Sequence, residues 1–300
     1  RRVLFRSVCT VTNELVYDQR MIRICSSLSN AGYDVTLIGR RFRNAPELTN
    51  HLYKQKRLFC FFKSGKLFYL EFNLKLFIYL LFTKTDAITA IDLDTIIPCL
   101  WASRIKKCKR FYDAHELFTE MKEVFSRPAI HRFWSRIERK TIPCFPNSYT
   151  VNKAIADIFK EKYHIDFEVI QNIARYDSTT NVNNQREKII LYQGAVNEGR
   201  CFETLIPAIK EMDCKLIICG DGNFMKQLKQ LIIDYQVGSK VTLLGKIEPS
   251  ELKTITGNAL VGITLFEAES TNNYLSLANR FFDYLHAGTP QLCMNYPAYH

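Results

Sequence analysis

Short apolar runs alternate with helix-like stretches along the first 120 residues of the chain. Val3–Val8 and Val35–Ile38 have the continuous apolar character of buried strands, and Asp18–Ala31 between them has the apolar spacing of a helix that ends at Gly32. The same alternation predicts further elements, namely strands at Leu58–Phe62, Asp86–Ile91 and Arg110–Tyr112 and helices at Leu67–Phe82 and Thr95–Arg104. Strands joined by helices of this length form right-handed crossovers, which predicts a parallel, doubly wound sheet.

The pattern stops and then restarts in the middle of the chain. After a short strand at Glu168–Gln171, residues 172–185 are rich in Asn, Thr and Ser and lack periodicity, which is typical of a linker. The alternation then resumes with strands at Lys188–Tyr192, Lys215–Cys219, Val241–Leu244 and Val261–Leu265 and helices at Phe202–Ile209, Phe224–Tyr235, Ser250–Gly257 and Ser276–Ala287. We therefore predict an α/β protein of two doubly wound domains, residues 1–172 and 187–300, with a linker at 173–186. Such a protein would bind its ligand in the cleft, at the carboxyl ends of the strands.

Residues 67–82 are the most apolar stretch, but two charged residues, Glu71 and Lys75, interrupt it. A membrane span needs roughly 20 apolar residues, so we predict a helix that does not cross a membrane. Helical spacing predicts a core face of Leu67, Leu70, Leu74, Phe77, Ile78 and Leu81. The remaining side, which carries Phe68, Phe72, Lys75 and Tyr79, is then the candidate for contact with a membrane surface.

The composition is that of a folded globular protein. The chain is 47% hydrophobic and 24% charged, with only 12 Gly and 9 Pro in 300 residues, which excludes disordered and collagen-like classes. Ten cysteines are scattered without a C-x-x-C pair or a zinc-like spacing. We interpret them as reduced thiols of a protein with no visible signal peptide, and we expect a cytoplasmic location.

The net charge of +11 comes from the first half of the chain. Residues 1–150 contain 26 Lys and Arg against 13 Asp and Glu, whereas residues 151–300 contain 15 against 17. A basic half favours an anionic partner, such as an acceptor or the inner face of an anionic membrane, although a solvated basic surface is the alternative. The chain lacks a recognisable nucleic-acid-binding module, so we predict no nucleic-acid partner.

The segment Tyr274–Pro290 carries the most informative polar residues. Ser276 is a good N-cap for the predicted helix, and the Gly-Thr-Pro sequence that follows would end it. The amides at the start of that helix would favour an anion such as a pyrophosphate. Asp283 would accept hydrogen bonds from two vicinal hydroxyls of a ribose, and Arg280 would lie against phosphate.

Eight segments occur in an order and spacing that can be compared with known families: 8–20, 32–40, 91–95, 112–120, 192–200, 219–222, 244–247 and 274–290. Together they resemble glycosyltransferases of the GT-B fold, close to family 4, of the type that builds bacterial surface polysaccharides. The resemblance implies a retaining, metal-independent, hexosyltransferase-like enzyme without a cofactor. Its partners would be a nucleoside-diphosphate sugar, with UDP and GDP both open, and a glycan or lipid-linked acceptor. Peripheral contact with the inner face of the membrane is a further hypothesis.

The resemblance implies a donor site in the second domain. Of the two acids of the family's Glu-x7-Glu element, the second is matched by Asp283 and the first falls on Leu275. The backbone amides of this stretch would then hold the diphosphate and the sugar, and they belong to Ser276, Leu277, Ala278 and Asn279.

Other donor contacts come from the loops that follow the strands. The family's phosphate-binding pair falls on Gly194-Ala195 and Arg200, which leaves Arg200 as the donor-phosphate candidate. Two further loops resemble the family's nucleobase side, at Gly220-Asp221-Gly222 and at Lys246-Ile247. A plain turn is the alternative for the glycine pair.

In the first domain the resemblance places His115 beside the transferred sugar. Because the leaving diphosphate would take the acceptor's proton, we assign His115 to sugar positioning and charge stabilisation, with a helix cap as the alternative. Asp92-Leu-Asp94 looks like the Asp-x-Asp of metal-dependent transferases, but we interpret it as a loop carboxylate pair, with acceptor contact as the alternative and no metal. The remaining acceptor-side candidates are Asn13, Asp18, Arg20 and Asp113, of which Asp18 is also a candidate helix cap.

Three other functions were weighed. A nucleotide-sugar epimerase would share the architecture, and a basic binding protein without enzymatic activity would explain the charge. A dinucleotide-dependent oxidoreductase is disfavoured because no G-x-G-x-x-G follows the first strand. The resembling family continues beyond Gly288-Thr-Pro290 with a further strand and helices, so we expect the second domain to be truncated in these 300 residues.

Overall fold

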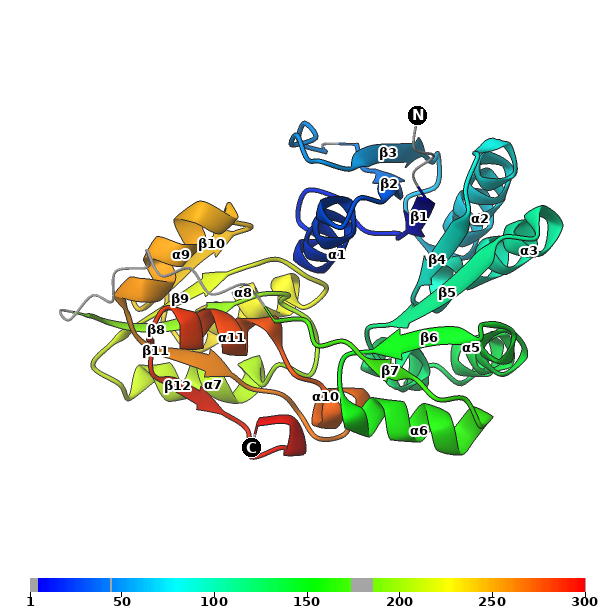
Figure 1. The fold of residues 1–300 in the computed structure, drawn as a ribbon. Coiled ribbons are helices and arrows are strands. Elements are labelled where there is room, and N and C mark those ends of the chain that lie inside the picture. The colour runs from blue at the N-terminus through cyan, green and yellow to red at the C-terminus, as the bar shows by residue number, and fades with distance from the viewer. Residues whose placement is uncertain (1–4, 44, 174–185, 300) are drawn as a thin grey trace. The chain divides into compact units, whose positions relative to one another are not determined.

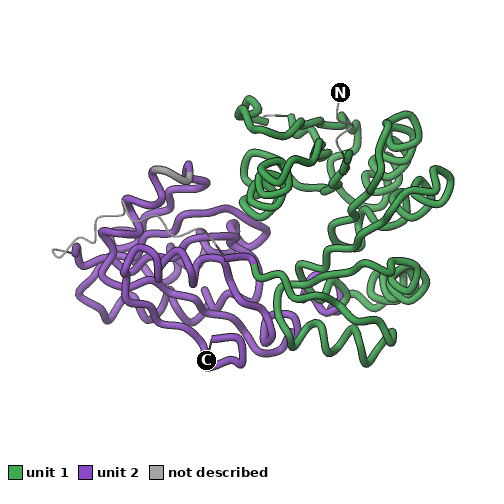
Figure 2. Tube along the Cα trace, viewed as in Figure 1, with its two compact units in different colours: residues 1–119, 127–171 green, residues 120–126, 172–300 purple. Residues whose placement is uncertain are grey.

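The computed structural model describes residues 5–43, 45–173 and 186–299 (Figure 1). The described residues divide into two compact α/β units (Figure 2). Unit 1 extends to Thr119 and resumes over Arg127–Gln171, whereas unit 2 comprises Glu120–Ser126 and the chain from Asn172 onward. The predicted linker lies, at positions 174–185, outside the described residues. The predicted fold class, two doubly wound parallel sheets, is confirmed.

Within the described part of unit 1, seven parallel strands lie in the order β3-β2-β1-β4-β5-β6-β7. The strands are β1 (Arg6–Thr10), β2 (Asp34–Arg41), β3 (Lys54–Phe59), β4 (Ala87–Ile91), β5 (Lys109–Ala114), β6 (Asn147–Thr150) and β7 (Glu168–Val169). The helices are α1 (Gln19–Asn30), α2 (Gly65–Phe82), α3 (Ile96–Lys106), α5 (Pro128–Thr141) and α6 (Lys153–Tyr163). The chain order reverses between β1 and β4, which places a topological switch point at the carboxyl ends of these two strands.

The local sequence explains the centre of this sheet. Every residue of β4 is buried, as expected of a central parallel strand with helices on both faces. Asp18 caps α1, because its carboxylate accepts a hydrogen bond from the Met21 amide at 3.0 Å. Met21 and Cys25, one helical turn apart, then pack against Leu37 of β2 in the core.

Helix α2 buries the side that the sequence assigned to the exterior. Its buried residues are Phe68, Phe72, Leu76 and Leu80. Of the predicted core face, Leu67, Leu70, Leu74 and Ile78 are exposed, and Phe77 and Leu81 are half-buried. The prediction was wrong because α2 is apolar on nearly every side, so that periodicity does not decide which side packs. Within the described chain, no helix combines the length and apolarity that crossing a membrane requires.

The described part of unit 2 contains five parallel strands in the order β10-β9-β8-β11-β12, with the switch point between β8 and β11. The strands are β8 (Glu187–Gln193), β9 (Lys215–Cys219), β10 (Val241–Gly245), β11 (Ala259–Thr264) and β12 (Gln291–Cys293). The helices are α4 (Lys122–Phe125), α7 (Phe202–Lys210), α8 (Met225–Asp234), α9 (Pro249–Asn258), α10 (Thr271–Leu275) and α11 (Asn279–His286). Short 3-10 turns occur at Leu93–Thr95, Phe118–Glu120, Ile142–Cys144 and Pro297–Tyr299.

The core of unit 2 is built on three aromatic residues. Phe202 packs on Tyr192 and on Phe224, with ring centroids 4.8 Å and 6.0 Å apart. The segment that carries α4 belongs to this unit because Lys122 forms an ion pair with Glu267, with its Nζ 2.6 Å from a carboxylate oxygen.

Several elements differ from the prediction. The third strand is Lys54–Phe59, an edge strand with a charged and polar sequence that an apolar-run criterion misses. The short strands β6 and β12 and the helices α5 and α6 were not predicted. The predicted helix Ser276–Ala287 corresponds to α11 alone, which begins three residues later than predicted, and the unpredicted helix α10 precedes it.

Candidate functional site

The carboxyl ends of β4 and β5 bring His115 between two carboxylates of unit 1. Its Nε2 lies 3.3 Å from Oδ2 of Asp113, and its Nδ1 lies 3.5 Å from Oδ2 of Asp92. Its backbone amide donates to Oδ1 of Asp92 at 3.0 Å. The side chain of His115 is 16% exposed, whereas that of Asp113 is fully buried. The cluster is therefore a pre-formed ion-pair site at the switch-point edge of the sheet.

Burial and the two carboxylates act on His115 in opposite directions. Burial lowers the pKa of His115, but Asp92 and Asp113 outweigh it and raise the pKa to about 9. Burial also raises the pKa of Asp113, yet His115 and Arg20 hold that pKa below its ordinary value. Burial raises the pKa of Asp92 to about 7. His115 is consequently an imidazolium at neutral pH.

Arg20, predicted on the acceptor side, contacts Asp113. It is buried on α1, and its Nη2 lies 2.5 Å from Oδ1 of Asp113. Asn13, also predicted on the acceptor side, donates through its Nδ2 to Oδ2 of Asp18 at 3.0 Å. Arg20 thus joins the His115 cluster, and Asn13 supports the cap of α1.

Asp92 and Asp94 form hydrogen bonds that connect three loops of unit 1. The amide of Asp92 donates to the Asp113 carbonyl at 2.9 Å, while its carboxylate holds the His115 amide. The carboxylate of Asp94 accepts a hydrogen bond from the hydroxyl of Thr12, a residue that the sequence analysis did not single out. In the part of the chain described, His, Cys, Asp and Glu side chains form no group of three or more suited to hold a metal ion.

In unit 2 a buried guanidinium lies at the switch point between β8 and β11. Arg280 stacks over the rings of Tyr192 and Phe266, at 4.4 Å and 5.3 Å from their centroids. Gly194 follows β8 with a positive φ of 124°, and a Cβ there would meet Nη2 of Arg280 at 3.4 Å. Only 8% of Arg280 is exposed, and among the described residues its Nη1 has no hydrogen-bond partner. This is a fixed positive charge with an unused donor.

Arg200 is a second cation that lies against the ring of Phe266. Its guanidinium lies 4.3 Å from the centroid of Phe266, and its Nη1 donates to Oδ1 of Asn273 at 2.8 Å. Both residues were predicted as phosphate contacts, but their shared position was not, because Arg280 comes from a helix 80 positions further along the chain. The tertiary structure therefore brings Arg200 and Arg280 to one aromatic residue.

Asp283 is oriented by a residue that sequence reasoning missed. Gln193, the last residue of β8, donates through its Nε2 to Oδ2 of Asp283 at 2.9 Å. The Oε1 of Gln193 in turn accepts from the hydroxyl of Thr256 at 2.8 Å. A buried polar side chain at the carboxyl end of a central strand was the available signal.

The glycines of the 220–222 turn allow two backbone segments to touch. A Cβ at Gly220 would lie 1.8 Å from the Gly194 carbonyl oxygen, and one at Gly222 would lie 2.2 Å from the Val196 carbonyl oxygen. Between them, the amide of Val196 donates to the Asp221 carbonyl at 3.1 Å. These glycines therefore shape the loop at this edge.

The other predicted donor residues differ in how far they are buried. Ile247 packs into an apolar cluster that contains Tyr284 of α11, whereas Lys246 and Asp221 are exposed. Leu277 lies half-buried in the stretch between α10 and α11.

The predicted N-cap at Ser276 is wrong. Ser276 follows α10, and its hydroxyl donates to the Asn273 carbonyl at 3.1 Å. Helix α11 begins three residues later, at Asn279, with Ala278 at its N-cap position. The amide of Ala278 donates to the hydroxyl of Tyr299 at 3.3 Å. This amide is therefore already used and is not offered to a ligand.

Two doubly wound parallel-sheet units are typical of the GT-B fold, and the solved structures that are similar to this chain have this fold. The fold is similar to a sucrose-phosphate synthase from Thermosynechococcus elongatus, with a TM-score of 0.69, 15% identity and coverage of 97% of this chain and 82% of that one. It is also similar to Anabaena Alr3699/HepE in complex with UDP and glucose, with a TM-score of 0.69, 11% identity and coverage of 98% and 82%. A glycosyltransferase from Rickettsia africae matches with a TM-score of 0.63, 12% identity and coverage of 98% and 80%.

The chain belongs to glycosyltransferase family 4. The family model described as Glycosyltransferase Family 4 matches residues 19–174, and the model described as Glycosyl transferases group 1 matches residues 177–271. No curated protein matches the chain significantly. The protein is a glycosyltransferase of the GT-B superfamily.

Proposed function

We propose that this glycosyltransferase moves a sugar from a nucleoside-diphosphate donor to a glycan or lipid-linked acceptor, with retention of anomeric configuration and without a metal. The single observation that carries the donor part is the buried guanidinium of Arg280, whose Nη1 has no hydrogen-bond partner in the described part of the chain. A guanidinium is charged at any physiological pH and matches phosphate oxygens in shape and charge. A donor diphosphate would satisfy that group.

Two neighbours of Arg280 support a diphosphate in particular. Arg200 lies over the same Phe266 ring and would bind a second phosphate oxygen. Gly194 has no side chain to block approach to the Arg280 guanidinium. On α11, one turn beyond Arg280, the Asp283 carboxylate is held by Gln193 and would accept hydrogen bonds from the ribose hydroxyls.

The charge state of His115 supports a role without proton abstraction. With a pKa raised to about 9, the ring is protonated near neutral pH and cannot act as a general base. An imidazolium stabilises a developing negative charge and positions a sugar hydroxyl. We therefore assign to the departing diphosphate the removal of the acceptor's proton, and to His115 the positioning of the sugar.

The proposed setting is polysaccharide biosynthesis at the inner face of the cytoplasmic membrane. Anabaena Alr3699/HepE has been solved with UDP-glucose, and a lipopolysaccharide outer core galactosyltransferase has the same fold at a TM-score of 0.56 and 13% identity. The basic first half of the chain fits an anionic or membrane-bound acceptor.

Nucleotide binding is the first test of this proposal. Thermal-shift titrations of the chain with UDP, GDP, ADP and NAD should give a shift with one nucleoside diphosphate and none with NAD. Arg280→Met and Asp283→Ala should abolish the shift, because each removes a donor contact. Asp234→Asn, a change at an exposed acid of α8, should leave it intact. A thermal shift with NAD but with none of the nucleoside diphosphates would contradict the proposal.

The reaction itself needs a second measurement. Incubation with the nucleotide sugar selected by thermal shift and a candidate acceptor should release the nucleoside diphosphate equally with and without EDTA. Proton NMR of the first product formed should show the donor's anomeric configuration. An inverted product contradicts the retaining assignment, and an altered free sugar without transfer would favour the epimerase alternative.

A further inference from the structure

Unit 1 exposes large apolar side chains on the neighbouring helices α2 and α3. They are Leu67, Leu70, Leu74, Ile78 and Phe82 of α2 and Trp101 and Ile105 of α3, here called the outer face. Phe82 is 86% exposed and Leu70 is 67% exposed. The two helices are joined by edge-to-face contact of Phe77 with Trp101. Soluble proteins rarely expose an apolar surface of this kind without a partner.

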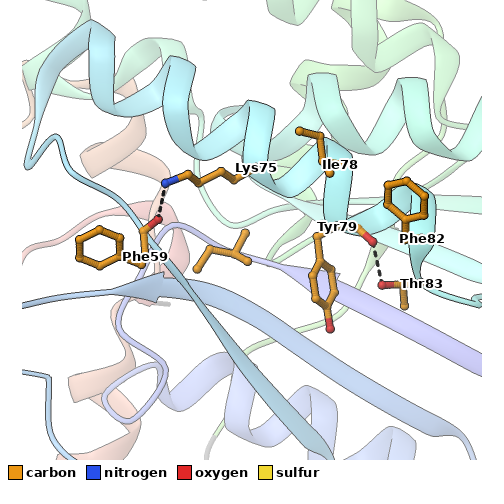
Figure 3. A pocket seen from close by; sticks show the side chains of 7 residues that line it. Phe59, Lys75, Ile78, Tyr79, Phe82 and Thr83 are labelled. Carbon is orange, nitrogen blue, oxygen red and sulfur yellow. Dashed lines mark hydrogen bonds between the residues drawn. The ribbon is translucent and has the colours of Figure 1, made fainter.

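An open cavity of about 640 Å³ adjoins the outer face between β3 and α2. Ile78 and Phe82 belong both to the cavity wall and to the outer face, so the cavity opens onto that face. Figure 3 shows Lys75 at one end, donating to the Phe59 carbonyl, and Phe82 at the other. The Lys75 ammonium is paired with Glu71 at 2.6 Å, which leaves the cavity walls mainly apolar.

The loop between β3 and α2 adds exposed aromatic side chains. Phe61 is 77% exposed, and Phe59 and Phe62 are exposed beside it. The Phe61 ring lies 5.1 Å from the Lys75 ammonium, which places this loop next to the cavity. Aromatic and aliphatic side chains next to lysines are typical of segments that lie in a membrane interface.

Most charged residues near the outer face are basic. Residues 54–84 contain a single acid, Glu71, and the basic residues Lys54, Lys56, Arg57, Lys63, Lys66, Lys75 and Lys84. Residues 101–110 contain no acid and the basic residues Arg104, Lys106, Lys107, Lys109 and Arg110. Lys75 is paired with Glu71, Lys54 with Asp34 and Arg57 with Glu14, so the excess positive charge comes from the other basic residues of these two stretches.

We propose that the outer face and its cavity dock the protein onto an anionic lipid bilayer. The apolar side chains would enter the boundary of headgroups and acyl chains, and the basic residues would contact lipid phosphates. This rests on the proposed function, because a lipid-linked acceptor lies in such a bilayer. A second copy of this chain fits poorly, because a two-fold contact through this face would bring the two basic rims together.

Flotation of the full chain with lipid vesicles tests the proposal. The protein should float with phosphatidylcholine vesicles that contain about 30% phosphatidylglycerol, and at least tenfold less with phosphatidylcholine vesicles. Leu70→Glu with Leu74→Glu should abolish flotation, because both side chains are exposed and would carry charge into the bilayer. Ile233→Glu, at an exposed apolar residue of α8 in unit 2, is the matched control and should float like wild type.

The basic rim is tested separately. Lys63→Glu with Lys66→Glu should lower the partition coefficient at least tenfold, and the difference from wild type should shrink at high salt. Lys226→Glu with Lys229→Glu, on exposed positions of α8, makes the same charge change elsewhere and should have a smaller effect.

Three outcomes would overturn the docking surface: equal flotation of wild type and Leu70→Glu with Leu74→Glu, equal flotation with both vesicle types, or a dimer in light scattering that the same double variant dissociates. The nucleotide thermal shift of each variant keeps this test separate from the proposed function. Lost flotation of wild type with an intact nucleotide shift rejects the docking surface only. Intact flotation without any nucleotide shift rejects only the proposed enzymatic function.

Discussion

Arg20, Asp113 and His115 of unit 1 are paired with one another and largely shielded from solvent. Asp113 accepts from Arg20 on one oxygen and lies 3.3 Å from His115 on the other. Removing one partner of such a buried pair leaves an uncompensated charge, which is why these residues act as a unit. The sequence indicated Arg20, Asp113 and His115 as separate candidates, and only the tertiary structure shows that they contact one another.

The raised pKa of His115 predicts a pH-dependent stability. Its pKa is about 9 in the folded protein against an ordinary value of 6.5, so its contribution is fully present below about pH 6.5 and is lost as the pH rises through 9. The free energy of unfolding of wild type, minus that of His115→Gln, should therefore fall by up to about 3 kcal/mol between about pH 6 and pH 10. Urea unfolding measures this difference.

NMR titration of the His115 ring is the direct check on the same prediction. A midpoint for His115 near 6.5 would contradict the ion-pair description of the cluster. The ring would then be largely neutral near pH 7, and His115 would be able to act as a general base.

At the scale of elements, short loops decide what the edge of unit 2 can bind. The 220–222 turn touches the loop after β8 so closely that no side chain fits at Gly220. The φ of Gly220 is +153°, which L residues also avoid. The sequence analysis weighed a nucleotide contact against a plain turn here, and the packing indicates a loop-shaping role.

Gly220→Ala should destabilise the protein by more than about 1 kcal/mol, because the added methyl group would overlap the Gly194 carbonyl. It should also weaken nucleotide binding, since the displaced loop carries Gly194 beside Arg280. Gly257→Ala in α9 is the matched control, because nothing lies within 4 Å of its new Cβ. Thermal unfolding with and without nucleotide measures both effects, and equal behaviour of the two variants would refute the loop-shaping role.

At the scale of the whole molecule, the two units have separate sheets and separate cores. One core contains Met21 and Leu37, and the other contains Tyr192 and Phe202. A donor that binds at the edge of unit 2 should therefore stabilise that unit directly. This distinguishes donor binding from a nonspecific salt effect on the basic first half of the chain.

Hydrogen exchange should locate the nucleotide. At a ligand concentration of roughly 100 times Kd, amides of the 194–200 loop and of α11 should exchange up to about a hundredfold more slowly. Amides of β2 in unit 1 provide the internal reference and should change little. In Asp283→Ala the slowing should disappear, and slowing confined to unit 1 would contradict the assignment of the donor site.

Much of the fold followed from local patterns. Buried parallel strands are apolar along their whole length, and helices between them have one apolar stripe, so β1, β4, β8 and β11 were recognisable as core strands. The residues directly after such strands lie at one edge, which is why His115, Gly194 and Asp92 were found. The edge strand β3 and the polar strand β6 lacked that signature and were missed or shifted.

The sequence by itself determined the class of fold and the residues at the strand ends, because these depend on short-range periodicity, and its motifs indicated the family by their resemblance to known glycosyltransferases. Only the tertiary structure decided which side of α2 is buried, since an apolar helix offers no amphipathic contrast. It also decided that Arg280 joins Arg200 at Phe266 and that Gln193 orients Asp283. These pairings join residues tens of positions apart, and long-range packing sets such distances.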